Sequence, residues 1–385
     1  MTVGRKSRQV VLAPDKFKGS LTAPEVAAAL AAGFARAAPD VPVRRLPVAD
    51  GGDGTVAAFV AAGWEPVWVD AVGPTDMPGT ATYAVRDETA IIELAEVVGY
   101  SKLPGAEPDP MYASTYGLGL VIRDALDRGF RTIVLGVGGS ASSDGGAGML
   151  QALGLRILDR NGNELPRGAA PLVQARTIEY GGLHPAVAAT TFVLAGDVDS
   201  PLLGPHGAVA VFAPQKGAGP EQCVELEAAL NNWSNVVAGS ADNSSRQSQD
   251  FALVPGAGAA GGTGFGAMAI LGAQSRSGIE VILELIDFTG RVQAGDLVVT
   301  GEGALDDQTL RGKAPAGVAA AARVAGAEVV AVAGSCTLSE AQLAAAGFTR
   351  CYALTDLEPD RARSIAGAAA LLEELGARIA SDFLP

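Results

Sequence analysis

The sequence predicts an α/β protein built from two α/β domains with mostly parallel sheets. Short runs of valine, isoleucine and leucine alternate with alanine-rich helical patterns along most of the chain, which is typical of parallel strands joined by helices. The chain has 385 residues, of which 48% are hydrophobic, enough for one large or two medium cores. Because the segment from Val67 to Leu94 departs from the alternation, we expect two domains.

The elements follow from hydrophobic periodicity. The predicted strands are Val10–Pro14, Val41–Val48, Thr132–Val137, Phe192–Gly196, Asp296–Thr300, Val329–Ala333 and Cys351–Leu354. The predicted helices between them are Ala23–Ala37, Thr55–Ala62, Tyr116–Arg128, Cys223–Ala238, Ala314–Ala325 and a terminal helix, Arg361–Ile379.

The middle of the chain predicts the domain division. From Val67 to Leu94, extended segments are separated by turn residues such as Gly73-Pro74 and Arg86-Asp87, which favours paired antiparallel strands. Regular alternation of strand and helix resumes after Asp296. We therefore expect a discontinuous α/β domain of residues 1–70 and 290–385, with an inserted α/β domain of residues 71–289.

Composition excludes several classes of function. The chain carries 28 basic and 42 acidic residues, a net charge of -14, so it lacks the basic face that nucleic acid requires. An anionic substrate would have to be held by a few placed lysines, arginines and backbone N–H groups. His184 and His206 form no zinc motif, and the three cysteines have no C-x-x-C spacing, so neither a zinc site nor a disulfide framework is expected.

Two apolar stretches bear on location. Val10–Ala13 is too short for the apolar region of a signal peptide, and we expect a cytoplasmic protein. Phe251–Ser275 is uncharged but contains Pro255 and several glycines. It is therefore expected to form a buried Gly/Ala-rich helix rather than a membrane span.

The strongest local signal is Leu135–Gly146, which reads LGVGGSASSDGG and begins at the end of a predicted strand. Its closely spaced glycines, including Gly138 and Gly139, let backbone N–H groups approach phosphate oxygens, and Ser140 can donate to them. Asp144 has the chemistry of a Mg²⁺ ligand. The alternative is a plain glycine-rich turn. No Walker sequence is present, so this is not an ordinary P-loop.

Charged residues also gather where the first predicted strand enters its helix. Ala13–Ser20 reads APDKFKGS, which offers the acid Asp15 and the cation Lys18 in one turn, and lysines in such loops bind phosphate. The alternative is a solvated loop in which Ser20 or Thr22 caps the helix.

A third group follows Phe192–Gly196. Asp197 and Asp199 lie on the same side of an extended chain and suit a hard cation or proton abstraction, although surface acids in a turn before Pro201 are the alternative. Lys216 offers a further cation in a loop downstream.

A fourth group follows the strand that ends at Thr300. Glu302, Asp306 and Lys313 lie in the sequence Gly301–Pro315, and ligands bind at such strand ends in open α/β sheets.

Two glycine patterns remain. Gly256–Gly261 matches G-x-G-x-x-G, but Pro255 precedes it where a strand should end, so close helix packing or a nucleotide-facing loop is favoured over a Rossmann site. Asp50–Gly54 (DGGDG) and Asp144–Gly148 (DGGAG) form a short recurrence, and each is expected between a strand and a helix.

These groups together suit phosphoryl transfer. That reaction requires carboxylates that bind Mg²⁺, cations for the phosphates and a base that orients the acceptor. The serine-hydrolase elbow and the protein-kinase motifs are absent.

The motifs, in their order along nearly the whole chain, resemble the bacterial glycerate kinase family. They are Ala13–Ser20, Pro47–Thr55, Gly136–Leu150, Gly196–Leu202, Phe212–Gly217, Pro255–Gly262 and Thr300–Pro315. The resemblance implies a two-domain enzyme, one domain flavodoxin-like or Rossmann-like, with its active site in the interdomain cleft. It also implies transfer of the γ-phosphate of Mg²⁺-bound ATP to D-glycerate, with 2-phosphoglycerate as the product.

The resemblance also implies the site residues. The catalytic residues are predicted to be Asp197 as the base, Lys18 and Lys313 as cations, and Asp144, which together with Glu302 is also a predicted metal ligand. The residues predicted to bind ATP are Gly138, Gly139, Ser140 and Lys216; those predicted to bind glycerate are Asp15, Asp50, Asp199, Glu302 and Asp306.

The chain departs from the family pattern at a few positions. Asp53 stands where glutamate is usual, Ser142-Ser143 where Thr-Asn is usual, and Ala304 where a basic residue is usual. The loss at Ala304 leaves the acceptor open, and the alternatives are a kinase of a related hydroxy acid or a non-catalytic ligand sensor on the same fold. Partners other than glycerate and ATP are not expected, and the sequence leaves open a monomer or a homodimer.

Overall fold

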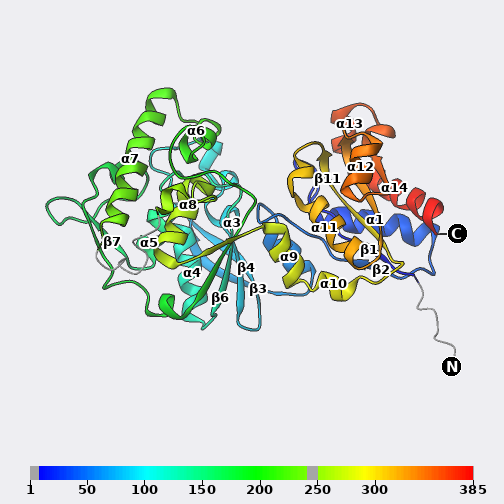
Figure 1. Ribbon diagram of the computed structural model, residues 1–385, viewed down its shortest axis with the longest axis horizontal. Helices are drawn as coiled ribbons and strands as arrows, with labels where there is room; N and C mark the ends of the chain where they lie inside the picture. The colour runs from blue at the N-terminus through cyan, green and yellow to red at the C-terminus, as the bar shows by residue number, and fades with distance from the viewer. Residues whose placement is uncertain (1–7, 241–249, 385) are drawn as a thin grey trace. The chain divides into compact units, whose positions relative to one another are not determined.

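The computed structural model describes residues 8–240 and 250–384. Within them the chain forms two compact units, each with a sheet of its own (Figure 1). Unit 1 comprises residues up to 50, 57–64 and from 277 onward, and unit 2 comprises 51–56 and 65–276. The proposed division at residues 70 and 290 lies somewhat further along the chain than these limits.

Unit 1 has a five-stranded parallel sheet in the order β13-β12-β11-β1-β2. The first strand of the unit therefore lies between the second and the third, which is the flavodoxin-like order. The strands are β1 (Val10–Leu12), β2 (Val43–Arg45), β11 (Leu297–Leu305), β12 (Glu328–Cys336) and β13 (Arg350–Ala353).

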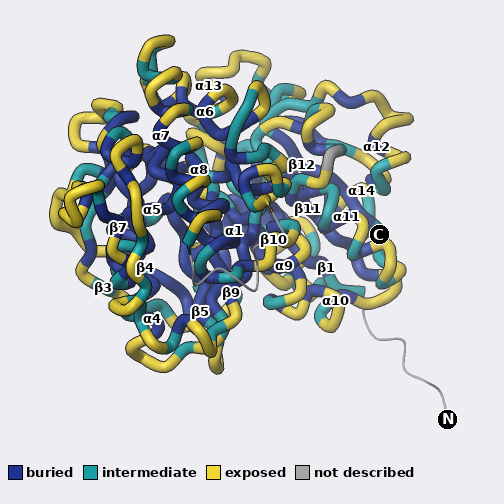
Figure 2. Tube along the Cα trace, turned by 60° about the vertical axis from the view of Figure 1, so that its left-hand side comes forward, coloured by how far each residue is buried: buried dark blue, intermediate teal, exposed yellow. Residues whose placement is uncertain are grey.

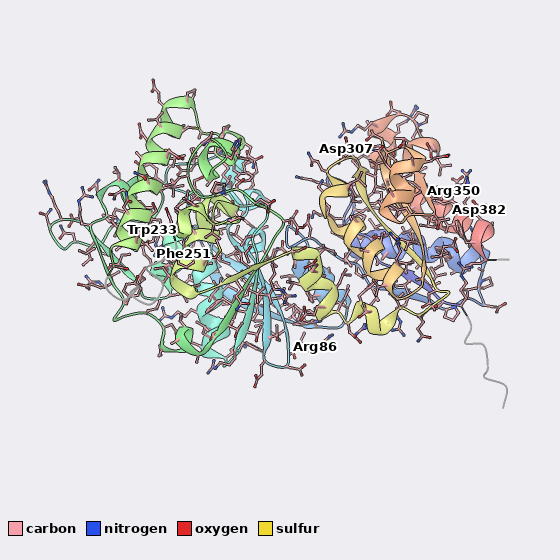
Figure 3. The ribbon with its side chains drawn as sticks, in the orientation of Figure 1. Arg86, Trp233, Phe251, Asp307, Arg350 and Asp382 are labelled. Carbon is pink, nitrogen blue, oxygen red and sulfur yellow. The ribbon has the colours of Figure 1, made fainter. Side chains whose placement is uncertain are left out.

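The helices of unit 1 complete its core. They are α1 (Ala23–Ala37), the larger part of α2 (Thr55–Ala61), α9 (Gly278–Leu285), α10 (Phe288–Arg291), α11 (Ala314–Val324), α12 (Glu340–Ala346), α13 (Arg361–Ala366) and α14 (Ala368–Phe383). Helices α1 and α14 touch through backbone, because a Cβ on Gly376 would lie 2.4 Å from the Leu30 carbonyl oxygen. Figure 3 labels Arg350 and Asp382, which tie β13 to α14 at 3.2 Å.

Unit 2 has a six-stranded sheet in the order β10-β9-β6-β5-β4-β3. Strands β10, β9, β6 and β5 are parallel, whereas β4 and β3 are antiparallel. The antiparallel pairing predicted between Val67 and Leu94 is therefore confirmed. The strands are β3 (Glu65–Val72), β4 (Pro78–Arg86), β5 (Thr89–Glu93), β6 (Thr132–Gly136), β9 (Thr191–Ala195) and β10 (Gln274–Arg276), with a separate pair, β7 (Arg156–Leu158) and β8 (Thr177–Glu179).

The second core gathers around the helices of unit 2. They are α3 (Leu94–Val98), α4 (Tyr116–Asp127), α5 (Ala147–Ala152), α6 (Ala208–Phe212), α7 (Pro220–Ala238) and α8 (Ala259–Gly266), which continues as a π-turn over Ala267–Leu271. Trp233 of α7 is the largest fully buried side chain described and is labelled in Figure 3. Figure 2 shows buried segments inside each unit and exposed loops around them.

The predicted fold class is confirmed, and several element predictions need correction. The strand predicted over Val41–Val48 forms only at Val43–Arg45, and Phe251–Ser275 is not one helix but a 3₁₀ turn at Phe251–Leu253, then α8 with its π-turn, and then the start of β10. Strand β11 runs on to Leu305 because Gly301 and Glu302 pair with Val332 and Ala333 of β12, so Glu302 lies in a strand rather than a loop. Helix α7 begins at Pro220 rather than at the predicted Cys223, because proline is favoured at the first position of a helix. The terminal helix is two helices interrupted at Gly367. No helix in the described part of the chain is long and apolar enough to span a membrane.

Candidate active site

The site begins in unit 1, at the carboxyl ends of β1 and β11. Asp15 follows β1, and its N–H donates to the Gly301 carbonyl oxygen of β11 at 2.8 Å. Glu302 is the next residue of β11. The order of the strands reverses between β1 and β11, and this switch point is where ligands bind in open α/β sheets. The fold thus places both predicted acids where a ligand is expected.

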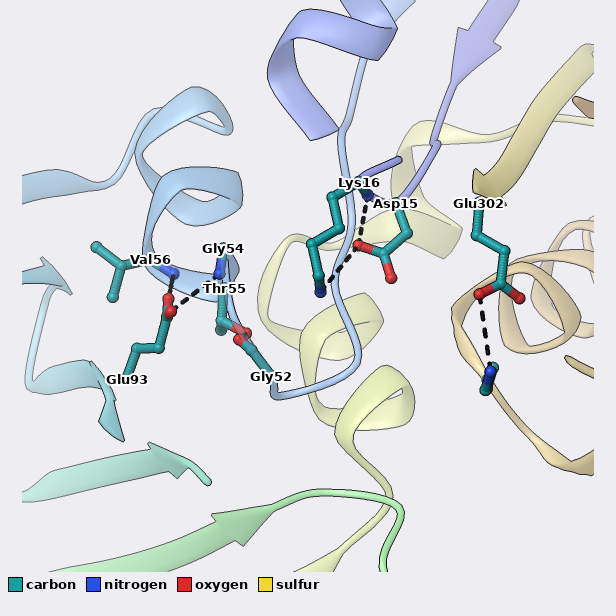
Figure 4. Close-up of polar contacts among 9 residues, drawn as sticks. Asp15, Lys16, Gly52, Gly54, Thr55, Val56, Glu93 and Glu302 are labelled. Carbon is teal, nitrogen blue, oxygen red and sulfur yellow. Dashed lines mark hydrogen bonds and ion pairs between the residues drawn. The ribbon is translucent and has the colours of Figure 1, made fainter. Parts of the chain in front are cut away.

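Asp15 is held in an unusual electrostatic state. Its side chain is almost fully buried, and this burial is the main reason that its pKa rises to about 7. The like charges of Asp50 and Glu302 raise the pKa further, whereas Lys16 lowers it. The backbone N–H of Lys16 donates to Asp15 Oδ1 at 2.6 Å, and the Lys16 Nζ lies 3.9 Å from the same oxygen (Figure 4). A carboxyl group that titrates near neutral pH is suited to handling protons.

Glu302 is the second acid of this edge. Burial raises its pKa, and Asp50 and Asp306 act in the same direction. Its Oε1 accepts from Thr309 Oγ1 at 2.7 Å, and Lys313 Nζ lies 4.0 Å from Oε2. Asp50, Glu302, Asp306 and Lys313 therefore interact within one cluster.

Lys18 lies in the loop between β1 and α1. Its side chain is exposed. A Cβ on Gly303 would lie 3.3 Å from the backbone nitrogen of Lys18, so this loop runs close to the end of β11. Thr22 caps α1 in a capping box with Glu25, as the alternative interpretation of this loop expected. Lys18 itself is exposed and can contact an anion from solvent.

Unit 2 contains a segment, Gly51–Val56, that we call the strap. It lies across the carboxyl ends of the parallel strands: Gly138 N donates to Gly51 O at 3.3 Å, and a Cβ on Gly51 would lie 2.4 Å from the Ala195 carbonyl oxygen. A Cβ on Gly138 would lie 2.6 Å from Gly52 Cα. The two glycine-rich motifs are thus packed against each other, and Gly138 is required by that packing.

Lys216 braces the glycine-rich loop after β6. It is 3% exposed, and its Nζ donates to Ser140 Oγ at 2.7 Å and to the Ser142 carbonyl oxygen at 2.5 Å. Burial lowers its pKa to about 7, against the opposing charge of Asp144. A Cβ on Gly261 would lie 2.9 Å from Nζ. Such enclosure favours a role in shaping the loop over the predicted direct contact with ATP.

Asp144 is fully buried, and burial raises its pKa. Its carboxylate accepts from the N–H groups of Thr115, Gly146 and Gly148 at 2.8, 3.2 and 3.1 Å, and from Thr115 Oγ1. Both oxygens are engaged in fixing the starts of α4 and α5. These contacts favour a positioning role over the predicted roles as metal ligand and catalytic acid.

Asp197 and Asp199 follow β9 and are exposed. They lie two and four positions beyond Ala195, whose carbonyl oxygen packs against the strap. Both lie exposed at the carboxyl edge of the sheet, where ligands bind in α/β proteins. Gly139 also lies on this edge, where its carbonyl oxygen accepts from Tyr100 N at 2.9 Å.

Comparisons with known proteins show the family to which the chain belongs. The model of the glycerate kinase family matches residues 10–384. The chain belongs to the glycerate kinase family. It is 41% identical to a glycerate kinase of Halalkalibacterium halodurans over 85% of each chain, and 41% identical to a glycerate 2-kinase of Escherichia coli over 86% of each chain. It is also similar to a crystal structure assigned as a glycerate kinase 2 of Salmonella typhimurium LT2, with a TM-score of 0.83, 37% identity and 98% of each chain covered.

A family that uses ATP raises the question of a metal. Within residues 8–240 and 250–384 no group of three or more potential side-chain ligands is preassembled. Mg²⁺ commonly takes only one or two carboxylates and completes its shell with water and phosphate oxygens. Glu302, with neighbouring Asp50 and Asp306, fits that donor chemistry, whereas the saturated carboxylate of Asp144 does not.

Two charged residues beside the predicted site were not among the predicted ones. Within the described residues Lys16, rather than the predicted cation Lys18, pairs with Asp15. Glu93, at the end of β5, accepts from the N–H groups of the strap. The signal for Glu93 was an isolated acid directly after the apolar run of a strand, a position that a buried carboxylate occupies only with partners.

Proposed function

We propose that the protein transfers the γ-phosphate of ATP to D-glycerate and releases 2-phosphoglycerate and ADP. The observation that carries the proposal is the cluster of acids at the switch point of unit 1, in a chain that matches the glycerate kinase family over residues 10–384. A degenerate relative that only senses a ligand would be expected to lose some of these groups, yet all of them are present.

The proposed division of labour follows from exposure and charge. Asp197 is exposed after β9 and can accept the proton of the attacking hydroxyl. Lys18 and Lys313 supply positive charge to phosphate or to the glycerate carboxylate. Glu302 would hold Mg²⁺ with at most one neighbouring carboxylate, Asp50 or Asp306, and the ion when bound would neutralise charge on the phosphate oxygens.

Other residues act through the loops that they hold. Lys216 and Asp144 keep the glycine-rich loop in one shape, so that its backbone N–H groups can face phosphate without rearrangement. Asp15, with a pKa of about 7, and Asp199 remain the proposed glycerate contacts. Because ATP is the donor, we place the enzyme in the cytoplasm.

The choice of acceptor is tested with a panel of hydroxy acids. ADP release is measured with D-glycerate, L-glycerate, tartronate and glycolate, and binding of each acid is measured by calorimetry. The proposal expects the highest kcat/KM with D-glycerate. Faster turnover of another acid would assign the related kinase, and binding without turnover of any acid would assign the sensor. Ala304, which is exposed on β11, is the first position to restore to lysine if the KM for glycerate is high.

A further inference from the structure

Glu93 is a buried carboxylate to which the proposed mechanism assigns no part. It is the last residue of β5 and is 3% exposed. Its Oε1 accepts from the Gly54 N–H and its Oε2 from the Val56 N–H, each at 2.9 Å (Figure 4). It forms no ion pair within the described part of the chain. Its two oxygens are therefore used to hold the backbone of the strap.

The two ends of the strap are held in different ways. Its first residues are packed by backbone contact, since Gly51 and Gly52 lie against the ends of β9 and β6. Its last residues open α2, where N–H groups lack partners within the helix. Glu93 supplies the acceptors for two of these groups, and so joins the end of β5 to the strap.

The side chain at position 93 must be a carboxylate to do this. A glutamine has one acceptor oxygen, and its NH₂ group would face the second N–H donor. Burial raises the pKa of Glu93 to about 7, and the charges of Asp53 and Glu96 raise it further, while the two backbone hydrogen bonds lower it. The two backbone N–H donors thus stabilise the charged form of Glu93 against the effect of burial.

The strap adjoins predicted site residues in the chain and within unit 2. It follows Asp50 directly in the chain, and it packs against Gly138, which opens the glycine-rich loop. A strap free to lift would release the Gly51–Gly138 contact and the backbone that leads out of Asp50. Displacements of about 1 Å in such positioning segments can lower catalysis about a hundredfold.

We propose that Glu93 is a positioning residue of the phosphoryl transfer reaction, which acts by clamping the strap at the Gly54 and Val56 N–H groups. This inference rests on the proposed function for its catalytic part. The clamp itself is a property of the free protein and can be measured without substrate.

The structural arm of the test uses Glu93→Gln and a matched control, Glu96→Gln. Glu96 lies three residues further on, is partly exposed and pairs with Lys102 at 3.8 Å. Amide hydrogen exchange of residues 51–56 in the whole protein is expected to become about tenfold faster in Glu93→Gln, because one hydrogen bond of this kind is lost, and to stay unchanged in Glu96→Gln. In the wild type, the Val56 amide resonance should titrate near pH 7, and this titration should vanish in Glu93→Gln.

The kinetic arm uses the same variants at saturating ATP and glycerate. Glu93→Gln is expected to lower kcat about tenfold or more with little change in the KM for ATP, since no substrate contact is removed. If Glu93→Gln does not fold, Glu93→Asp serves in its place, because it retains the charge but shortens the reach. Unchanged exchange at residues 51–56 overturns the clamp, and faster exchange with normal kcat overturns the positioning role. If the wild type shows no glycerate kinase activity while the exchange effect is present, the proposed function fails and the clamp stands.

Discussion

Replacement of Lys216 by methionine tests whether this lysine braces the glycine-rich loop. Methionine fills most of the volume but cannot donate, so the Ser140 hydroxyl and the Ser142 carbonyl oxygen lose a partner. Each buried acceptor left without a donor costs about 1–3 kcal/mol. We therefore expect unit 2 to lose roughly 3 kcal/mol of unfolding free energy in alkaline solution, where the folded amine is neutral.

The loss should depend on pH with a definite sign. Folding lowers the pKa of Lys216 from 10.5 to about 7, so between these values the unfolded chain binds more protons than the folded one. The wild type consequently gains stability as the pH rises through this window, by up to about 1.4 kcal/mol per pH unit, and Lys216→Met does not. The deficit of the variant must therefore grow from pH 7 to pH 9.5.

The assay is urea unfolding followed by tryptophan fluorescence at these two pH values. Trp233 reports on the loop directly, because its Nε1 donates to the Gly145 carbonyl oxygen at 3.2 Å. Lys102→Met, at an exposed lysine of the same unit, is the control. A deficit below about 0.5 kcal/mol, or one that does not grow with pH, would refute the brace, because surface changes fall within that range.

Three further outcomes are expected. Asp197→Asn should lower turnover by about 10²–10⁴ with ATP affinity unchanged, as expected for loss of a general base; near-normal turnover measured in a steady-state assay would remove Asp197 from the mechanism. Asp15 has its pKa raised to about 7 by burial, so its contribution to stability is present at low pH and is lost as the pH rises through 7. Thermal unfolding should therefore show Asp15→Asn gaining relative to the wild type between pH 5 and pH 8, and a constant difference in Tm would contradict this. Gly138→Ala should lower the unfolding free energy measured in urea by about 1–3 kcal/mol, because its Cβ would lie 2.6 Å from Gly52 Cα. The control Gly181→Ala, whose Cβ meets nothing within 4 Å, should leave the unfolding free energy unchanged. Equal effects of the two substitutions would refute the packing argument.

Much of the fold could be predicted because each element satisfied its own local rule. Helix α1 was predicted with the bounds that the structure shows, since Thr22, Pro24 and the alanine-rich face all mark one start and one period. The end of β11 could not be predicted in this way. Gly301 and Gly303 predict a loop from the sequence. In the structure, however, Gly301 is a strand residue, and the absence of a Cβ lets β12 approach it.

The places of some predicted site residues in the fold follow from strand ends, because the carboxyl edge of a parallel sheet collects ligand-binding residues. Asp15 follows β1 and Asp197 follows β9, as predicted, whereas Glu302 lies within β11. The contacts of Asp144 depend on Thr115, which directly precedes α4 and is brought to Asp144 by the tertiary fold. Spacing along the chain carries no information on such contacts, and the same holds for the enclosure of Lys216 by Gly261.

The most direct test of the proposed function is ³¹P NMR of the purified protein with Mg-ATP and D-glycerate, with EDTA and acceptor-free controls. The account predicts equal amounts of ADP and 2-phosphoglycerate, and no product in either control. Formation of 3-phosphoglycerate would contradict the proposed position of transfer, and an unchanged spectrum with folded protein would contradict glycerate kinase activity itself.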